Sequence, residues 1–143
     1  MSVLSEESPF YPIDPERVIM ETDVAVAFFD GFPISEGHAL VVPRFPVISL
    51  FELDSDMQAA VWETVRLTRE MLEAKFHPEG FNIGINDGQA AGQTIPHAHI
   101  HIIPRYKGDV PDPRGGIRWI IPEKAKYWEG AKEAEGSLDC LRV

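Results

Sequence analysis

Short apolar runs, separated by prolines and glycines, predict β-strands in the first third of the chain. Residues 24–29 are apolar and rich in strand-forming types, and Asp30 and Gly31 make a turn after them. A second apolar run at residues 38–42 is followed by Pro43, which we expect to end it. The short connection between the two runs predicts an antiparallel pair.

The middle of the chain carries the one long helical pattern. Apolar residues recur at steps of three or four between residues 57 and 72, and charged residues fill the opposite side. Ser55 is the predicted N-cap, with Gln58 as its capping-box partner. His77 stands before a proline, where we expect it only to cap the end. The sequence thus predicts an amphipathic helix over residues 55–76.

Two further strands are predicted after the helix, at residues 81–86 and 97–103, with Pro104 closing the second. Residues 118–121 form a candidate short strand. The charged residues 123–143 form either a short helix or a tail. This order predicts an α+β fold, an antiparallel β-sheet with one long helix and a short one. The length of 143 residues corresponds to a single domain.

Composition narrows the classes of protein to which the chain can belong. Lys and Arg number 13 against 23 Asp and Glu, and the resulting net charge of −10 argues against a protein that coats nucleic acid. No apolar run is long enough to span a membrane, and the N-terminal residues lack the pattern of a secretory signal. We therefore expect a cytoplasmic protein. Cys140 is the only cysteine, which excludes an internal disulfide and a cysteine-based zinc site.

Three histidines at steps of two, His97, His99 and His101, are the most informative feature. On a strand they share one face, about 7 Å apart, while the residues between them point into a core. One interpretation is a polar strand face, and another is a metal site. Neighbours on one flat strand do not readily converge on an ion, so we expect no metal.

Phosphoryl chemistry is the interpretation that the surrounding residues favour. Imidazole is a good nucleophile near neutral pH, and its adduct with phosphorus is labile enough for water to resolve. The loop before the histidines contains Gly88 and Gly92, which allow backbone N–H groups to face an anion, and Gln93 and Thr94 add neutral donors. Between residues 81 and 119, four basic minus three acidic residues give +1, which leaves room for a small nucleotide.

The histidine segment resembles a known signature. Residues 97–103, His-Ala-His-Ile-His-Ile-Ile, match the His-φ-His-φ-His-φ-φ pattern of the histidine triad superfamily. Residues 87–94 resemble the corresponding loop of the fragile histidine triad hydrolases, and residues 30–43 look like the family's nucleotide-pocket strands. The resemblance covers about residues 8–121, the expected core, and leaves 123–143 as a charged C-terminal tail.

The resemblance implies a role for each matching residue. His99 matches the nucleophile that forms a nucleotidyl intermediate, and His97 and His101 match the flanking histidines that hold the α-phosphate and assist the leaving group. His38 matches a supporting fourth histidine; a buried core histidine is the alternative. The implied substrate-binding residues are Asp30 on the ribose, Asn86, Gln93 and Thr94 on the phosphates, and Phe10, Phe28, Phe29 and Leu40 around the base.

Two of these assignments have simpler alternatives. Asp30 also suits a plain turn beside Gly31. Phe28 and Phe29 point to opposite faces of a strand, so one of them belongs to the core.

The implied activity is that of a nucleotide hydrolase. It cleaves at the α-phosphate of adenosine nucleotide derivatives, either dinucleoside polyphosphates or nucleoside phosphoramidates. The alternatives are a nucleotidyltransferase to phosphate or a sugar phosphate, and a nucleotide-binding regulatory module with weak catalysis. His101 favours water as the acceptor, because transferring relatives typically carry Gln there.

The resemblance also implies cofactors and partners. We expect no built-in cofactor, although a divalent cation such as Mg²⁺ accompanies a polyphosphate substrate. Phe10 and Tyr11 stand where several relatives carry cysteines, so no structural zinc is expected. The expected partner is a second copy, joined through residues 55–76, with Trp119 completing the partner's site. Arg114 and Arg118 either reach a polyphosphate or lie in solvent. We expect no nucleic acid and no membrane as partners.

Overall fold

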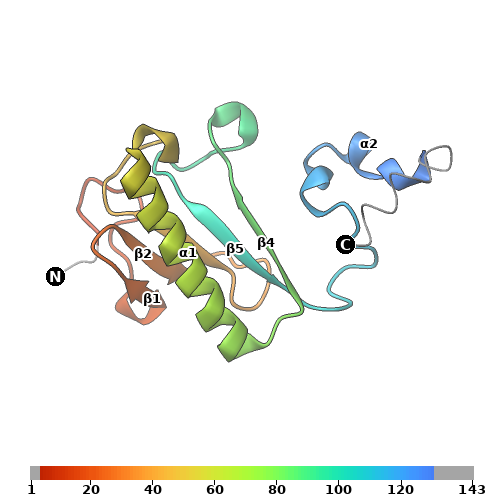
Figure 1. Cartoon of the computed structure of the whole chain (residues 1–143), viewed down its shortest axis with the longest axis horizontal. Helices are drawn as coiled ribbons and strands as arrows, with labels where there is room; N and C mark the ends of the chain where they lie inside the picture. Colours follow the sequence, from red (N-terminus) through yellow and green to blue (C-terminus); the bar gives the residue numbers. More distant parts are fainter. Residues whose placement is uncertain (1–3, 131–143) are drawn as a thin grey trace. The chain divides into compact units, whose positions relative to one another are not determined.

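The computed structural model describes residues 4–130, and the chain divides into two compact units at Tyr106 and Lys107. The first unit contains a five-stranded antiparallel β-sheet in the order β1-β2-β3-β5-β4, with one long helix, α1 (Figure 1). This arrangement confirms the predicted α+β fold. The elements of this unit are β1 Val18–Glu21, β2 Ala25–Phe29, β3 Ala39–Pro43, α1 Ser55–Phe76, β4 Gly80–Ile85 and β5 Ile100–Arg105, with 3₁₀ turns at Pro15–Arg17, Leu50–Glu52 and Gln89–Ala91.

The prediction that a proline ends each of two strands was confirmed for Pro43 and wrong by one residue for Pro104. Pro43 is the last residue of β3, and Pro104 lies inside β5. The β3–β5 ladder spans only Ala39–Val41 on β3, so Pro43 and Pro104 each face a neighbouring strand on one side alone. A proline without an N–H is tolerated at such edge-like positions.

Helix α1 has the predicted bounds, but its N-cap is Asp54 and not Ser55. The carboxylate of Asp54 accepts from the Met57 N–H at 2.8 Å. Gln58 does not complete a capping box; its side-chain amide donates to the Leu53 carbonyl. At the other end, His77 adopts the left-handed conformation with φ 52° and donates its backbone N–H to Glu73, as a C-terminal cap.

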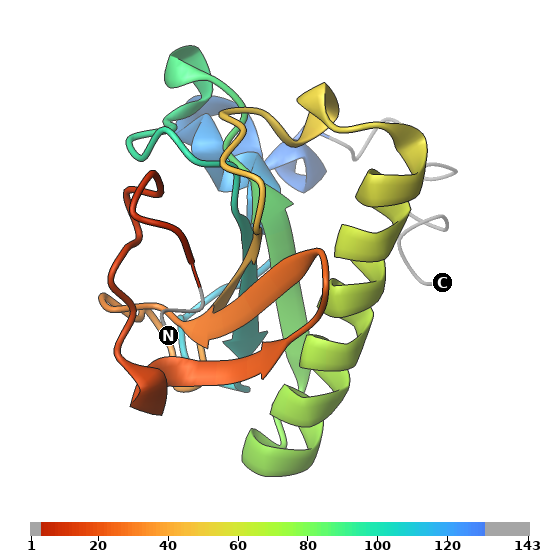
Figure 2. The same ribbon diagram turned by 90° about the vertical axis from the view of Figure 1, so that its left-hand side faces the viewer.

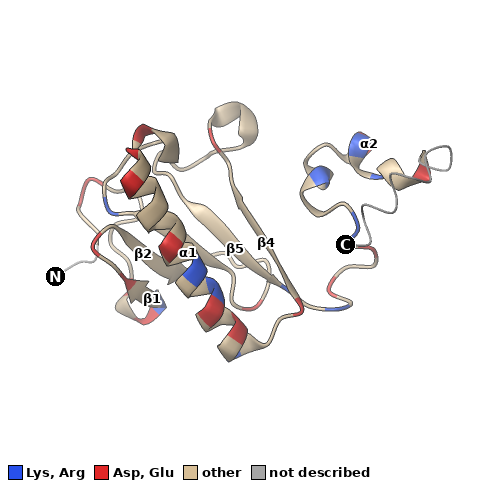
Figure 3. Cartoon of the chain, in the orientation of Figure 1, with Lys and Arg blue, Asp and Glu red and all other residues tan. Residues whose placement is uncertain are grey.

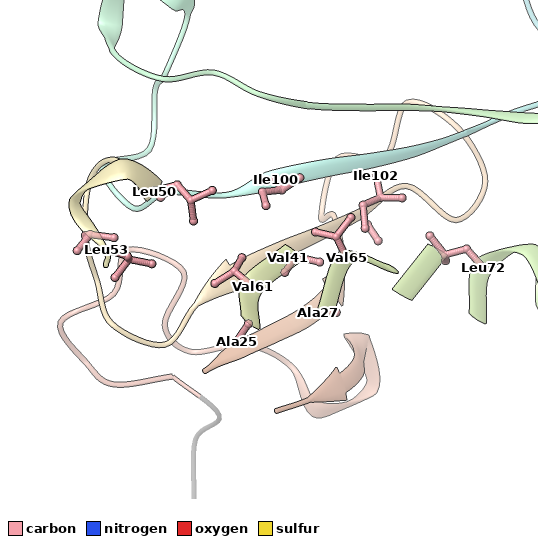
Figure 4. Packing of buried hydrophobic residues seen from close by; sticks show 13 residues of the cluster. Ala25, Ala27, Val41, Leu50, Leu53, Val61, Val65, Leu72, Ile100 and Ile102 are labelled. Atoms are coloured by element: carbon pink, nitrogen blue, oxygen red, sulfur yellow. The ribbon is translucent and has the colours of Figure 1, made fainter. Parts of the chain in front are cut away.

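One face of the sheet is covered by α1. The buried residues of α1 are Val61, Thr64, Val65, Thr68 and Leu72. Figure 4 shows the apolar ones packed against alternate residues of the strands, including Ala27, Val41 and Ile102. Charged residues of α1 lie on its other side, whereas β2 and β3 carry none (Figure 3). This separation is the amphipathic pattern that the sequence predicted.

Gly37 allows the end of α1 to approach the sheet closely. Its φ is +87°, and a Cβ built there would lie 2.7 Å from the ring of Phe76. Both the left-handed backbone and the ring contact exclude a larger residue.

The opposite face of the sheet is covered by the N-terminal segment, as Figure 2 shows in red. A second apolar cluster lies there, composed of Leu4, Ile13, Val26, Phe28, Leu40 and Val42. The cross-strand register places Phe28 opposite Leu40, and Leu40 opposite His101. A histidine of the triad therefore shares the sheet face that α1 leaves uncovered.

The second unit is described over residues 107–130. It contains a 3₁₀ helix at Gly116–Ile120, the short helix α2 at Pro122–Ala125 and a 3₁₀ turn at Tyr127–Glu129. The predicted strand at residues 118–121 was wrong, because the Arg118 guanidinium turns back to the carbonyls of Lys124 and Ala125 and lies 4.7 Å from the ring centre of Tyr127. The remaining tail, 131–143, lies outside the described residues. No helix within residues 4–130 has both the length and the apolar character of a membrane span.

Candidate active site

The histidine triad lies at the start of β5 rather than along it. Only His101 is on the strand, while His97 and His99 precede Ile100, where β5 begins. The residues between them alternate as predicted: Ala98, Ile100 and Ile102 are buried in the cluster under α1. The imidazoles consequently lie closer together than a regular strand would place them, with 5.1 Å between the ring centres of His99 and His101.

His97 is fully buried, and both of its ring nitrogens are engaged. Nε2 lies 2.8 Å from the carbonyl oxygen of Pro43, and Nδ1 lies 2.7 Å from the hydroxyl of Ser8. A carbonyl only accepts, so Nε2 carries the proton and Nδ1 accepts from Ser8. The expectation that His97 holds the α-phosphate does not fit this geometry, because neither nitrogen is open to a ligand.

His99 has the opposite tautomer. Its Nδ1 lies 2.8 Å from the backbone carbonyl of His97, which fixes the proton on Nδ1. Its Nε2, which carries the lone pair, has no hydrogen-bond partner within residues 4–130. The residue is 8% exposed, so a small part of the ring reaches the surface.

A chain of hydrogen bonds fixes the tautomers of His38 and His101. The backbone N–H of Ile34 donates to Nδ1 of His38, so Nε2 of His38 carries its proton. That Nε2 lies 3.0 Å from Nδ1 of His101 and 3.4 Å from a carboxylate oxygen of Asp30. Because Nδ1 of His101 accepts, the proton of His101 is on Nε2.

Burial favours the uncharged form of three of the imidazoles, those of His38, His97 and His101. Desolvation lowers the pKa of His38 and of His97, although Asp30 opposes the shift at His38 and the hydrogen bond to Pro43 opposes it at His97. Desolvation is also the main cause that lowers the pKa of His101 to about 4, and the nearby His99 and His38 lower it further. The uncharged form is therefore favoured at His38, His97 and His101.

Asp30, His38 and His101 also offer ligand atoms within 4.8 Å of one another, which is the spacing of a metal site. The hydrogen bonds do not suit one. A metal on Nε2 of His38 would require that nitrogen to lose its proton, which would then sit on Nδ1 against the N–H of Ile34. The residues present fit a proton chain better than a cation.

An aromatic wall borders the triad. The ring of Phe10 contacts His99 edge-on at 5.3 Å, and it also contacts His97 at 5.6 Å and Phe28 at 5.5 Å between centres. Leu40 lies on the same sheet face as Phe28. Phe29 does not join them: it lies on the α1 face, edge-on to Phe76 at 6.0 Å.

The three expected phosphate residues differ in their surroundings. The side chain of Gln93 holds the loop by hydrogen bonds to the backbone. Its oxygen accepts from the N–H of Gly88, and its nitrogen donates to the carbonyls of Ile48 and Ile95. Asn86 and Thr94 make no side-chain hydrogen bond within the described residues, and Thr94 is exposed. These two side chains remain available to a ligand, whereas Gln93 shapes the loop.

Comparison with known proteins places the chain in a family. A family model described as the HIT domain matches residues 13–108. The chain belongs to the HIT domain family. This HIT domain is 41% identical over 93 residues to an asymmetrical bis(5'-nucleosyl)-tetraphosphatase of Schizosaccharomyces pombe, covering 65% of the chain and 51% of that protein.

Two further relatives support the same family. A bifunctional bis(5'-adenosyl)-triphosphatase/adenylylsulfatase FHIT of Arabidopsis thaliana is 37% identical over 99 residues, which are 69% of this chain and 55% of the relative. The crystal structure of a HIT family protein from Bacillus anthracis matches with a TM-score of 0.61 at 34% identity, covering 64% of this chain and 65% of that one. The chain spans about half the length of the two curated relatives.

Ser8 is the residue of this HIT domain that the sequence did not single out. It lies in the irregular lead-in, far from the triad along the chain, and is 4% exposed. Its neighbour Pro9 and the two following prolines suggested only an extended segment. No local signal identifies its contact with His97, because the two residues are 89 positions apart.

Proposed function

We propose that this HIT domain is a nucleotide hydrolase that cleaves at the α-phosphate of adenosine nucleotide derivatives, through a nucleotidyl intermediate on His99. The observation that supports it best is the pair of opposite tautomers. His99 presents a lone pair on Nε2, and beside it His101 presents an N–H on Nε2. The proposed nucleophile and a hydrogen-bond donor therefore lie on neighbouring rings, whose centres are 5.1 Å apart.

In the first step, Nε2 of His99 attacks the α-phosphorus. The bond from phosphorus to the bridging atom breaks, and its electron pair leaves with the remainder of the substrate. The Nε2–H group of His101 donates a hydrogen bond to oxygen atoms that gain negative charge in this step. The substituted imidazole of His99 becomes a cation, whose Nδ1–H remains bonded to the His97 carbonyl.

In the second step, water attacks the same phosphorus. The phosphorus–nitrogen bond breaks, its electron pair returns to Nε2 of His99, and the proton lost by water passes to solvent. The nucleoside monophosphate is released. The hydrogen bond from Nδ1–H of His99 to the His97 carbonyl keeps the lone pair of His99 on Nε2, where the attack requires it.

Asp30 and the aromatic wall account for nucleoside binding in this proposal. The carboxylate of Asp30 accepts from the N–H of Phe32 on one oxygen, and its other oxygen faces His38. Lone pairs remain for ribose hydroxyls. Phe10 supplies an apolar surface for the base, with Phe28 and Leu40 beneath it, while Asn86 and Thr94 offer donors to phosphates.

The names of the relatives guide the choice of substrate. The S. pombe and A. thaliana proteins are named for nucleoside tetraphosphate and triphosphate bonds, and the latter also for an adenylylsulfate. A dinucleoside polyphosphate is therefore our first choice, with a divalent cation carried by the substrate. The cytoplasmic location, the homodimer and the single domain over residues 1–143 stay predictions.

The test is a turnover panel of diadenosine triphosphate, diadenosine tetraphosphate and adenosine phosphoramidate. We expect AMP as a product, and oxygen from labelled water on its phosphate. His99→Ala is expected to lose turnover while still binding AMP. His77→Asn is the matched control, because His77 is outside the histidine cluster and its backbone caps the C-terminal end of α1.

Two results would contradict the proposal. One is full turnover by His99→Ala; the other is wild-type inactivity on all three substrates, with and without Mg²⁺. A new product that contains added phosphate or sugar phosphate would favour the nucleotidyltransferase instead. An adduct on His99, quenched in alkali where phosphorus–nitrogen bonds persist, would identify the intermediate directly.

A further inference from the structure

Ser8 is a buried polar residue of the first unit that the proposed chemistry does not use. Its hydroxyl oxygen accepts from the backbone N–H of Phe10 at 3.1 Å and lies 2.7 Å from Nδ1 of His97. Its own backbone is held as well, by bonds to Ser5 and Tyr11. The Ser8 hydroxyl is therefore a buried polar group with two defined hydrogen-bond partners in an otherwise irregular segment.

The direction of these bonds follows from the atoms alone. The carbonyl of Pro43 accepts from Nε2–H of His97, so Nδ1 of His97 is an acceptor and the Ser8 hydroxyl is its donor. The bonds run in one sense, from the Phe10 N–H through Ser8 and the His97 ring to Pro43. Both ends of the ring are therefore fixed, and with them the tautomer.

The backbone of His97 connects these hydrogen bonds to His99, the proposed nucleophile. Its carbonyl accepts from Nδ1–H of His99 at 2.8 Å, and its own N–H is bonded to Ile95. The Phe10 N–H bonded to Ser8 also locates the Phe10 ring, which lies edge-on to His99. Two of the groups that surround the His99 imidazole thus depend on one hydroxyl.

We propose that Ser8 is a positioning residue, whose hydroxyl fixes the His97 tautomer and, through the His97 carbonyl and Phe10, aims Nε2 of His99. The role of the aimed nitrogen rests on the proposed function. The hydrogen-bond relay itself does not, because it is a property of the resting protein.

The decisive measurement is ¹⁵N–¹H NMR of the imidazole groups in the wild type, Ser8→Ala and Ser8→Thr. The wild type is expected to show the proton of His97 on Nε2 and that of His99 on Nδ1. Ser8→Ala removes the hydroxyl that donates to the buried Nδ1 of His97, so His97 is expected to show mixed tautomers or protonation. Ser8→Thr keeps the hydroxyl and is expected to retain the wild-type pattern.

Kinetics give the second measurement. Ser8→Ala is expected to lower kcat roughly 10- to 100-fold with a smaller change in KM, as for a misaimed nucleophile, and Ser8→Thr is expected to recover most of it. Wild-type tautomers together with wild-type kcat in a folded Ser8→Ala would overturn the inference while leaving the hydrolase intact. Should Ser8→Ala not fold, Ser8→Thr decides: a lost His97 tautomer there, in a folded protein, contradicts the relay.

Discussion

His38 donates its Nε2 proton to Nδ1 of His101 across 3.0 Å, and this bond leaves the proton of His101 on its own Nε2. It predicts that the two amide replacements of His38 differ. A Gln amide nitrogen lies about where Nε2 of histidine does, whereas an Asn amide reaches only the position of Nδ1. We expect His38→Gln to retain part of kcat, and His38→Asn to lose roughly 100-fold. Equal kcat values for the two folded variants would contradict this assignment.

The lowered pKa of His101, about 4, predicts loss of stability in mild acid. The unfolded chain binds a proton near pH 6.5, whereas folded His101 does so only near pH 4. Between these values the unfolded state binds more protons. The contribution of His101 to the free energy of unfolding is therefore fully present above pH 6.5 and is lost as the pH falls towards 4. The slope is at most about 1.4 kcal/mol per pH unit for one such histidine.

Urea unfolding of the wild type and of His101→Asn from pH 7 to 4 measures this contribution. The variant is expected to show the shallower dependence, because the carboxylates are common to both proteins. Parallel curves would show that His101 titrates alike in the folded and unfolded states.

The contact between Gly37 and Phe76 predicts a large cost for one methyl group. In Gly37→Ala, the left-handed backbone and the ring 2.7 Å from the new Cβ act together, and we expect a loss of about 2–3 kcal/mol. Gly88→Ala is the matched control, since Gly88 has φ +98° but nothing within 4 Å of its Cβ position. Thermal or urea unfolding compares the two variants. If Gly37→Ala loses no more stability than Gly88→Ala, the Phe76 ring moves aside without cost and the prediction is wrong.

The left-handed backbone of His77 predicts that one substitution increases the stability of the protein. A non-glycine residue at φ 52° is strained, and the exposed His77 side chain makes no hydrogen bond or ion pair within residues 4–130. His77→Gly is therefore expected to stabilise the protein by about 0.5–1 kcal/mol in urea unfolding, with AMP binding unchanged. A destabilised variant would mean that the imidazole contributes to the helix end.

The fold was predictable wherever a period repeated. The alternation of Ala98, Ile100 and Ile102 identified the buried side of the histidine segment, and steps of three and four identified α1. Strand β1 was missed, because its four residues include a bulge in the pairing with β2 and have no alternation to detect. Asp54 displaced Ser55 as the cap because its carboxylate reaches the Met57 N–H.

The sequence pattern predicted that the histidines gather in one cluster, but not the contacts that each of them makes. Alternation placed Phe28 and Phe29 on opposite faces, but which of them faces the histidines depends on how the sheet packs on α1. The spacing of the triad likewise contains no information on tautomers. Those depend on Ser8, Pro43 and Ile34, which the fold brings to the imidazoles from other parts of the chain.

The bond between Ser8 and His97 joins positions 89 residues apart, and the intervening chain includes α1 and four of the five strands of the sheet. A contact between such distant positions forms late in folding, because the loop between them must first be ordered. No local segment of the chain can therefore position His99, the proposed nucleophile, before the whole sheet has formed. During denaturation, enzymatic activity is expected to disappear no later than the global unfolding of the sheet, which makes turnover a sensitive reporter of the native topology.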